Sequence, residues 1–283
     1  MAHTYKVLEK LGSGSQGEIF KAIDKTENTV ALKIFKHPSN GVYEFHMLKY
    51  LQSHANIIDV YDTYQDKGDV YVVMEYMNGD NLFVFLQKVK HLLTENIIRG
   101  IIKSILNGLK HIHSKGVVHR DLKLENIMIN EQNKIKIIDF GLAAKYEVSK
   151  NERNAIGSVP YIAPEMQNGN GGGYKIDSWA LGIILFELLF GNSPFLGDNI
   201  YDQHLHIPNT RVISNEVKHL LYMLLLHDQS ARYSLDQISS HPWMNHYTIP
   251  KYKLWKLTEY KRVCTQSWKC SFERHMHIVY NIS

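Results

Sequence analysis

Two short segments of this sequence carry side chains that suit the transfer of a phosphoryl group. One is the stretch 119–126, which contains Asp121, Lys123 and Asn126, and the other is the triplet that begins at Asp139. In such a reaction a carboxylate accepts the proton of the attacking hydroxyl, hard oxygen atoms bind magnesium, and a lysine stabilises the moving phosphate. Each residue alone would more often be a turn or cap residue. The two segments in this order and spacing predict a catalytic site.

A glycine-rich segment near the N-terminus could hold phosphates at the other end of this site. Gly12, Gly14 and Gly17 fit the pattern G-x-G-x-x-G, and glycine lets the backbone approach phosphate oxygens because it has no Cβ. Dinucleotide-binding proteins share the pattern, but there the loop opens a helix, whereas a strand is predicted after Gly17. On this motif alone, an ordinary glycine hairpin is the alternative.

Lys33 follows in an apolar segment that has the pattern of a strand. A lysine is costly to bury there unless it has a partner. The partner that we expect is Glu44, on the next predicted helix, and the pair would then hold phosphate oxygens. The alternative is that Lys33 points to solvent from an edge strand.

The predicted elements change in kind along the chain. Strands are predicted over 5–11, 18–23, 29–35, 57–64 and 70–75, with one helix over 42–51. Long helices are predicted over 94–113, 177–190 and 215–226. The fold class that we expect is α+β with two lobes, a small β-rich lobe over 1–76 and a larger, mainly helical lobe over 77–248, followed by an extension over 249–283. The glycine-rich run 168–173 is predicted to be a flexible surface loop.

Composition narrows the classes of protein. The chain has 283 residues, a formal net charge of +4 and two cysteines, Cys264 and Cys270. Two cysteines are too few for a disulfide framework, and they show no zinc-binding pattern. The small net charge does not argue for nucleic acid as a required partner, and no apolar run indicates a signal peptide or a membrane span. We expect an intracellular protein, cytoplasmic, nuclear or both, that uses no membrane; the oligomeric state is left open.

Taken together, these motifs resemble those of the eukaryotic protein kinases, from about Tyr5 to His246. Further matches are the triplet 163–165, the segment that begins at Asp177, and Arg232, which resembles the arginine that pairs with Glu165. The resemblance implies a bilobal kinase fold with one αC helix in the small lobe. It implies ATP as the phosphate donor and Mg²⁺ as the metal ion, with Mn²⁺ able to substitute.

The resemblance also implies roles for single residues. Asp121, Lys123 and Asn126 resemble the catalytic residues, with Asp121 as the base, and Asn126 and Asp139 resemble the magnesium ligands. The positions that resemble the ATP-binding set of the family are Leu11, Gly12, Ser13, Gly14, Gly17, Ile19, Ala31, Lys33, Glu44, Met74, Glu75, Met77, Met128 and Asp139.

The substrate is expected to be a serine or threonine hydroxyl of a protein. Lys123, two residues after Asp121, and Ser158 resemble features of the serine/threonine kinases. Glu125 and Glu187 match glutamates that receive arginine in cyclic-AMP-dependent and calmodulin-dependent kinases, which predicts Arg-rich substrates. Alternatively, the two glutamates only balance local charge. The compact chain looks like the kinases of large DNA viruses such as baculoviruses.

The activation segment, which in the family ends at the triplet matched here by residues 163–165, departs most from the family. Asn154 takes the usual phosphorylation position, and Ser149 is the nearest upstream hydroxyl. Arg120, which in the family normally meets an activating phosphate, is nevertheless present. We predict that Glu147 or Glu152 offers the negative charge instead, which would make the enzyme active as synthesised.

The extension over 249–283 mixes lysines with aromatic residues. We expect it to pack on the large lobe, because so many aromatic side chains are unfavourable in water. The alternatives are an autoinhibitory or partner-binding helix, a surface for an acidic partner, and nucleic-acid contact. For the whole chain, the alternative is a kinase-fold binding or scaffold protein that acts through this tail. That function would need a broken catalytic site, and every catalytic position expected from the family is filled.

Overall fold

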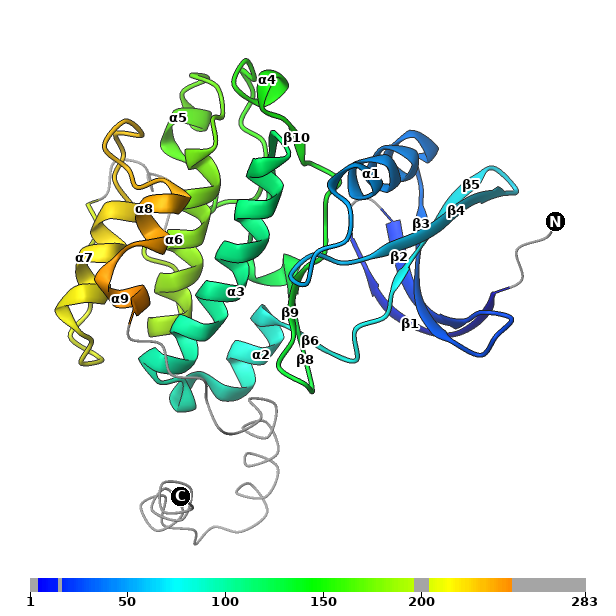
Figure 1. Cartoon of the computed structure of the whole chain (residues 1–283), viewed down its shortest axis with the longest axis horizontal. Coiled ribbons are helices and arrows are strands. Elements are labelled where there is room, and N and C mark those ends of the chain that lie inside the picture. The colour runs from blue at the N-terminus through cyan, green and yellow to red at the C-terminus, as the bar shows by residue number, and fades with distance from the viewer. Residues whose placement is uncertain (1–4, 15–16, 196–203, 246–283) are drawn as a thin grey trace, which may run out of the picture.

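The computed structural model of the chain describes residues 5–14, 17–195 and 204–245. Figure 1 shows two lobes side by side, one a β-sheet with a single helix and the other made mostly of helices. The predicted α+β fold with two lobes is therefore confirmed. The extension predicted over 249–283 lies outside the described residues.

Five antiparallel strands form the sheet of the small lobe, in the order β1-β2-β3-β5-β4. They are β1 (Lys6–Ser13), β2 (Gly17–Ile23), β3 (Thr29–Phe35), β4 (Val60–Asp66) and β5 (Asp69–Glu75). Successive side chains of a strand point to opposite faces. In β3, Ala31 and Phe35 belong to the main core while Val30 and Leu32 belong to a second apolar cluster. Because β3 is buried on both faces, it holds Lys33 on a rigid strand.

One helix, α1 (Pro38–Leu51), packs on the inner face of this sheet through Met47, Leu48 and Leu51. It begins at Pro38, so the predicted start at residue 42 was wrong. Proline suits the first turn of a helix because its φ is already helical and its missing N–H is not needed there. The helix lies so close to the sheet that a Cβ on Gly41 would be 2.7 Å from Val70 Cγ1.

The large lobe is built around α6 (Lys175–Phe190), whose residues are almost all buried. A helix that is apolar on every side belongs in a core. The surrounding helices are α2 (Leu82–Val89), α3 (Glu95–Ser114), α4 (Tyr146–Ser149), α5 (Pro164–Gln167), α7 (Asn215–Leu224), α8 (Leu235–Ser239) and α9 (Pro242–Asn245), with short 3-10 turns at Lys90–Leu92 and Leu124–Asn126.

Short strands at the lobe boundary position the catalytic segments. They are β6 (Gly79–Asn81), β7 (Val117–Val118), β8 (Ile127–Asn130), β9 (Ile135–Ile137) and β10 (Ala144–Lys145). The stretch 119–126 lies between β7 and β8, and Asp139 follows β9 by two residues. A parallel bridge between Ile57 and Ile137 ties β9 to the segment before β4. Both catalytic segments therefore start from strands anchored in the core.

A buried ion pair holds the outer part of the large lobe. Arg232, which is fully buried, bonds both carboxylate oxygens of Glu165 on α5, with Nη1–Oε1 at 2.7 Å and Nη2–Oε2 at 2.8 Å. The same guanidinium also donates to the carbonyl oxygens of Leu226 and Lys175. Such a pair is favourable in a core only when its remaining hydrogen bonds are made, as they are here.

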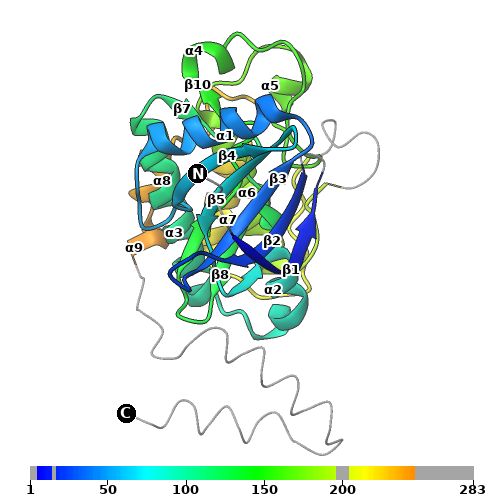
Figure 2. The ribbon, with the colours of Figure 1, turned by 90° about the vertical axis from the view of Figure 1, so that its right-hand side faces the viewer.

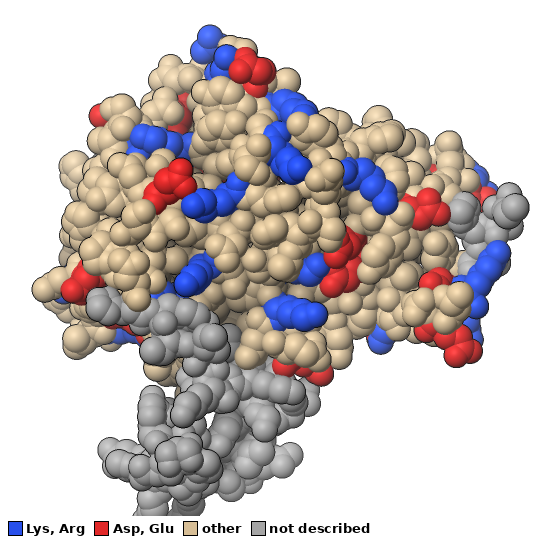
Figure 3. All heavy atoms as spheres, in the orientation of Figure 1, with Lys and Arg blue, Asp and Glu red and all other residues tan. Residues whose placement is uncertain are grey.

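The described surface shows charges of both signs. On the face in Figure 3, lysine and arginine side chains alternate with aspartate and glutamate, and neither sign forms a continuous patch. Among the helices of the described ranges, none has both the length and the apolar character needed to cross a membrane.

Candidate active site

Lys33, Glu44 and Asp139 meet between the lobes. The Nζ of Lys33 lies 2.6 Å from Glu44 Oε2 and 3.4 Å from Asp139 Oδ1. Glu44 points from α1 toward the sheet and is completely buried, whereas the side chain of Asp139 is 31% exposed. The alternative of a solvent-facing Lys33 is thus excluded, and the predicted pairing with Glu44 is confirmed.

The electrostatics favour the charged forms of Lys33 and Asp139, whereas burial raises the pKa of Glu44 despite its pairing with Lys33. Burial works against the ammonium of Lys33, but Glu44 and Asp139 outweigh it, so the pKa of Lys33 lies above its ordinary value. Burial likewise opposes the carboxylate of Asp139, but Lys33 and the N–H of Gly141, 3.1 Å away, keep the pKa of Asp139 below its ordinary value. Asp139 is therefore an ionised oxygen ligand at neutral pH.

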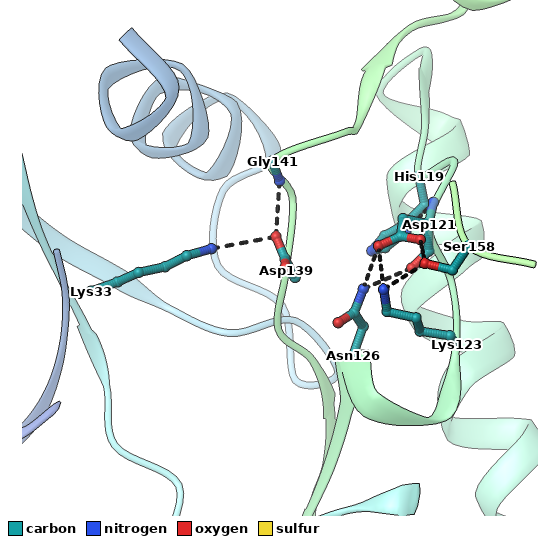
Figure 4. A network of polar contacts seen from close by, with 8 residues as sticks. All are labelled: Lys33, His119, Asp121, Lys123, Asn126, Asp139, Gly141 and Ser158. Atoms are coloured by element: carbon teal, nitrogen blue, oxygen red, sulfur yellow. Dashed lines mark hydrogen bonds and ion pairs between the residues drawn. The ribbon is translucent and has the colours of Figure 1, made fainter. Parts of the chain in front are cut away.

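A second polar network holds the loop 119–126, the predicted catalytic loop (Figure 4). Ser158 Oγ donates to Asp121 Oδ1 at 2.8 Å and accepts from Lys123 Nζ at 2.7 Å, while Lys123 Nζ lies 2.9 Å from Asp121 Oδ2. Asn126 Nδ2 donates to the backbone oxygen of Asp121 at 2.8 Å and to its Oδ2 at 3.0 Å. Four residues predicted for the reaction are thus brought together, with Asp121 at the centre.

Asp177, at the start of α6, fixes the backbone of this loop. Its carboxylate accepts from the N–H groups of His119 and Arg120 at 2.9 and 3.1 Å, and from His113 Nε2 at 2.7 Å. Arg120 has φ +68°, an unfavourable value for a non-glycine residue, and these bonds hold it there. Asp177 was predicted at the start of the helix over 177–190, but this role was not predicted. An acidic residue at the start of a largely apolar helix was the signal that could have found it.

The oxygen ligands that suit magnesium are present in the right chemical form. Asp139 is ionised, and the N–H₂ group of Asn126 donates its hydrogen bonds to Asp121. In Figure 4 the side-chain oxygen of Asn126 points toward the side where Asp139 lies. Carboxylate and amide oxygens are ligands that Mg²⁺ accepts. The residues present therefore fit a magnesium ion between the two segments.

Several apolar residues of the expected ATP-binding set lie in or against the main core. Ala31 pairs with Met74 across β3 and β5, and Met77 belongs to the same core cluster, against which Met128 packs. Ile19 lies in β2, opposite Lys33. The side chain of Glu75, by contrast, accepts a hydrogen bond from Lys136 Nζ at 2.6 Å.

The glycine-rich loop is partly a packing feature. A Cβ on Gly17 would lie 1.9 Å from the oxygen of Ile34, so this glycine is required by the sheet itself. Gly12 and Gly14 have open space where a Cβ would be. Leu11, Gly12 and Ser13 end β1 at this loop, and Gly14 N donates to Gly17 O at 2.9 Å. The open side of the loop can accept phosphate oxygens.

The two glutamates predicted to receive arginine lie close to each other. Glu187 on α6 accepts a hydrogen bond from Tyr161 Oη at 2.6 Å. Burial and the nearby charge of Glu125 raise the pKa of Glu187 to about 7, although the bond from Tyr161 favours the carboxylate. Glu125 itself is exposed. The site is therefore acidic, but its charge depends on pH near neutrality.

Glu147 and Glu152, the two residues of the activation segment predicted to replace an activating phosphate, have different partners. Glu152 Oε2 lies 3.7 Å from Arg120 Nη1, whereas Glu147 lies 2.5 Å from Lys150 Nζ on an exposed turn. Ser149 is completely buried. Its hydroxyl donates to a backbone oxygen in the glycine-rich run 168–173. The run was predicted to be a flexible surface loop; Gly171 and Gly172 are instead buried against the activation segment, whereas residues 168–170 are exposed or half-buried.

Comparison with known proteins agrees with this geometry. Residues 5–244 match the protein kinase domain family, which is most of the chain, and the protein belongs to that family. A probable serine/threonine-protein kinase of Zea mays is 36% identical over 70% of this chain and 33% of its own length. Calcium-dependent protein kinase 4 of Plasmodium berghei is 35% identical over 85% of this chain and 49% of its own length.

A human relative is covered over a larger share. Myosin light chain kinase family member 4 of Homo sapiens is 34% identical over 87% of this chain and 68% of its own length. The chain thus spans between about a third and two thirds of the length of these three relatives.

Proposed function

We propose that this protein is an ATP-dependent kinase that phosphorylates serine and threonine residues of proteins. The observation that supports this most strongly is the joint arrangement of Asp121, Lys123 and Ser158, bonded to one another at 2.7 to 2.9 Å. Lys33 and Asp139 face this group from the other side of the site (Figure 4). These side chains are already oriented, so little reorganisation is needed when the substrates bind.

In the proposed reaction, Asp121 orients the substrate hydroxyl and takes its proton. The hydroxyl oxygen bonds to the γ-phosphorus while the bond from that phosphorus to the bridging oxygen breaks, and ADP leaves. Lys123 stabilises charge on the transferred group, and Lys33 holds phosphate oxygens of the nucleotide. Asp139 and Asn126 would hold Mg²⁺, which would supply positive charge against the phosphates.

The test is a transfer assay with radiolabelled ATP and three protein substrates, one basic, one acidic and one rich in tyrosine. Label should appear on serine or threonine after hydrolysis of the product to amino acids. Label on tyrosine alone would contradict the proposal, and so would the absence of transfer to all three proteins. The second outcome would favour the binding or scaffold function, although Asp121, Lys123, Asn126 and Asp139 are all in place.

We further propose a preference for Arg-rich substrates. Glu187 and Glu125 lie close together, and a guanidinium can form charge-assisted bonds to carboxylates. The hydroxyl of Tyr161 already bonds Glu187 and orients it. The competing explanation, local charge balance, is disfavoured because a carboxyl group with a raised pKa has too little opposite charge near it.

This preference should depend on pH. The pKa of Glu187 is about 7, so the group is mostly neutral at pH 6 and mostly charged at pH 8. Because arginine binds the charged form, KM for an arginine-containing peptide should fall about five- to tenfold from pH 6 to pH 8. The same peptide with alanine in place of arginine is the control. Glu187→Gln should remove the difference, and an unchanged pH dependence in that variant would contradict the assignment.

We also propose that Glu152 replaces an activating phosphate beside Arg120. The variant Glu152→Gln should lower kcat/KM for a peptide about three- to tenfold, because it removes the negative charge that lies 3.7 Å from Arg120 Nη1. Glu147→Gln is the matched control, since Glu147 pairs with Lys150 instead, and it should change the rate less than twofold. Both proteins are assayed after phosphatase treatment. Equal rates in the two variants, or an inactive dephosphorylated wild type, would contradict the proposal.

A further inference from the structure

The glycine-rich run 168–173 lies against the activation segment through its backbone. Ser149, at the end of α4, accepts from the N–H of Gly172 at 2.8 Å through its backbone oxygen, and its hydroxyl donates to the oxygen of Gly172. The same oxygen of Ser149 accepts from the N–H of Glu152 at 3.1 Å. One buried serine thus connects the run to the residue that faces Arg120.

Glycine is needed in this run because its backbone lies directly against the backbone of the activation segment. Gly171 has φ +81°, and a Cβ there would lie 2.0 Å from the oxygen of Lys150. A Cβ on Gly172 would lie 2.5 Å from Met166 Sδ. A clash with a backbone oxygen cannot be relieved by a side-chain rotation, so a larger residue at 171 must push the activation segment away.

Contacts on both sides of Ser149 extend this attachment. Arg153 Nη1 donates to the oxygen of Gly169 at 2.9 Å. Tyr146 stacks on Tyr174 with ring centroids 4.4 Å apart and an angle of 16° between the rings. In Figure 1, α4 and α5 lie at the same end of the large lobe, and the run follows α5. The activation segment is therefore held from Tyr146 to Arg153.

We propose that residues 168–173 form a clamp, called here the glycine clamp, that positions the activation segment for catalysis. Through Ser149 the clamp places Glu152 beside Arg120, and the chain then continues to Ser158 at Asp121. Neutral hydrogen bonds to the backbone would thereby hold the activation segment in place, as a phosphorylated side chain would hold it through its charge. This inference rests on the proposed kinase activity, and it identifies Gly171 and Ser149 as positioning residues.

The test compares Gly171→Ala with Gly191→Ala in the full chain. Both glycines have φ +81°, so alanine is strained at either position, but a Cβ on Gly191 would meet only the flexible side chain of Lys90, at 3.4 Å. Gly171→Ala should lower kcat/KM for a peptide about tenfold, while KM for ATP stays within about twofold. Trypsin should also cleave after Lys150 or Arg153 about tenfold faster. Gly191→Ala should change neither rate.

Equal peptide kinetics and equal cleavage rates in the two variants would overturn the clamp. Ser149→Ala gives an independent check if Gly171→Ala does not fold, because it removes one hydrogen bond and adds no atom. Its cleavage rate should rise about threefold, and a rate equal to wild type would also count against the clamp. Cleavage by trypsin does not require kinase activity. A wild type without kinase activity would therefore refute the proposed function, but the cleavage rates would still test the clamp.

Discussion

Replacement of Asp139 with asparagine should lower kcat for phosphoryl transfer by about a thousandfold or more. The carboxylate of Asp139 is held ionised by Lys33 and the Gly141 N–H, and an amide offers neither its charge nor its second oxygen. The transferred group carries negative charge that must be neutralised, so the loss falls on the transition state. The measurement is initial-rate transfer from radiolabelled ATP at saturating peptide.

A matched control separates this effect from a loss of folding. Asp236→Asn makes the same chemical change on α8, where the carboxylate is 86% exposed and pairs with Lys110. It should leave kcat unchanged within about twofold. Full residual activity in Asp139→Asn, with the melting temperature of the control, would rule out a catalytic role for Asp139.

Replacement of Arg232 with alanine should cost about 3 to 5 kcal/mol of unfolding free energy, because it leaves the carboxylate of Glu165 buried without its partner. For a domain of this size the melting temperature should fall by roughly 6 to 20 °C. Loss of the bonds to Leu226 and Lys175 adds to the effect. Differential scanning calorimetry of the purified variant measures the change.

Two further variants test the cause. Lys110→Ala breaks an exposed ion pair and should cost less than about 1 kcal/mol. The double replacement Glu165→Met with Arg232→Met leaves no buried charge, so it should be more stable than Arg232→Ala. If Arg232→Ala and Lys110→Ala shift the melting temperature equally, burial of the unpaired carboxylate is not the cause.

Short motifs correctly predicted which side chains lie together where those side chains are close in the chain. The loop 119–126 and the triplet at Asp139 each place several functional groups within a few residues, and both emerge from strands. The start of α1 was missed, because proline at the first turn extended the helix before its apolar stripe begins. The burial of Gly171 and Gly172 was not predicted, because glycine is typical of mobile loops and of close backbone contacts alike.

The sequence by itself determined the family, the two-lobed fold and the groups available for phosphoryl transfer, since these depend on spacing within short segments and on residue periodicity. Only the tertiary structure decided which groups meet. Glu44 rather than solvent faces Lys33, Glu152 rather than Glu147 faces Arg120, and Asp177 bonds a loop 58 residues away. Contacts between residues so far apart in the chain depend on how whole elements pack, and no local pattern carries that information.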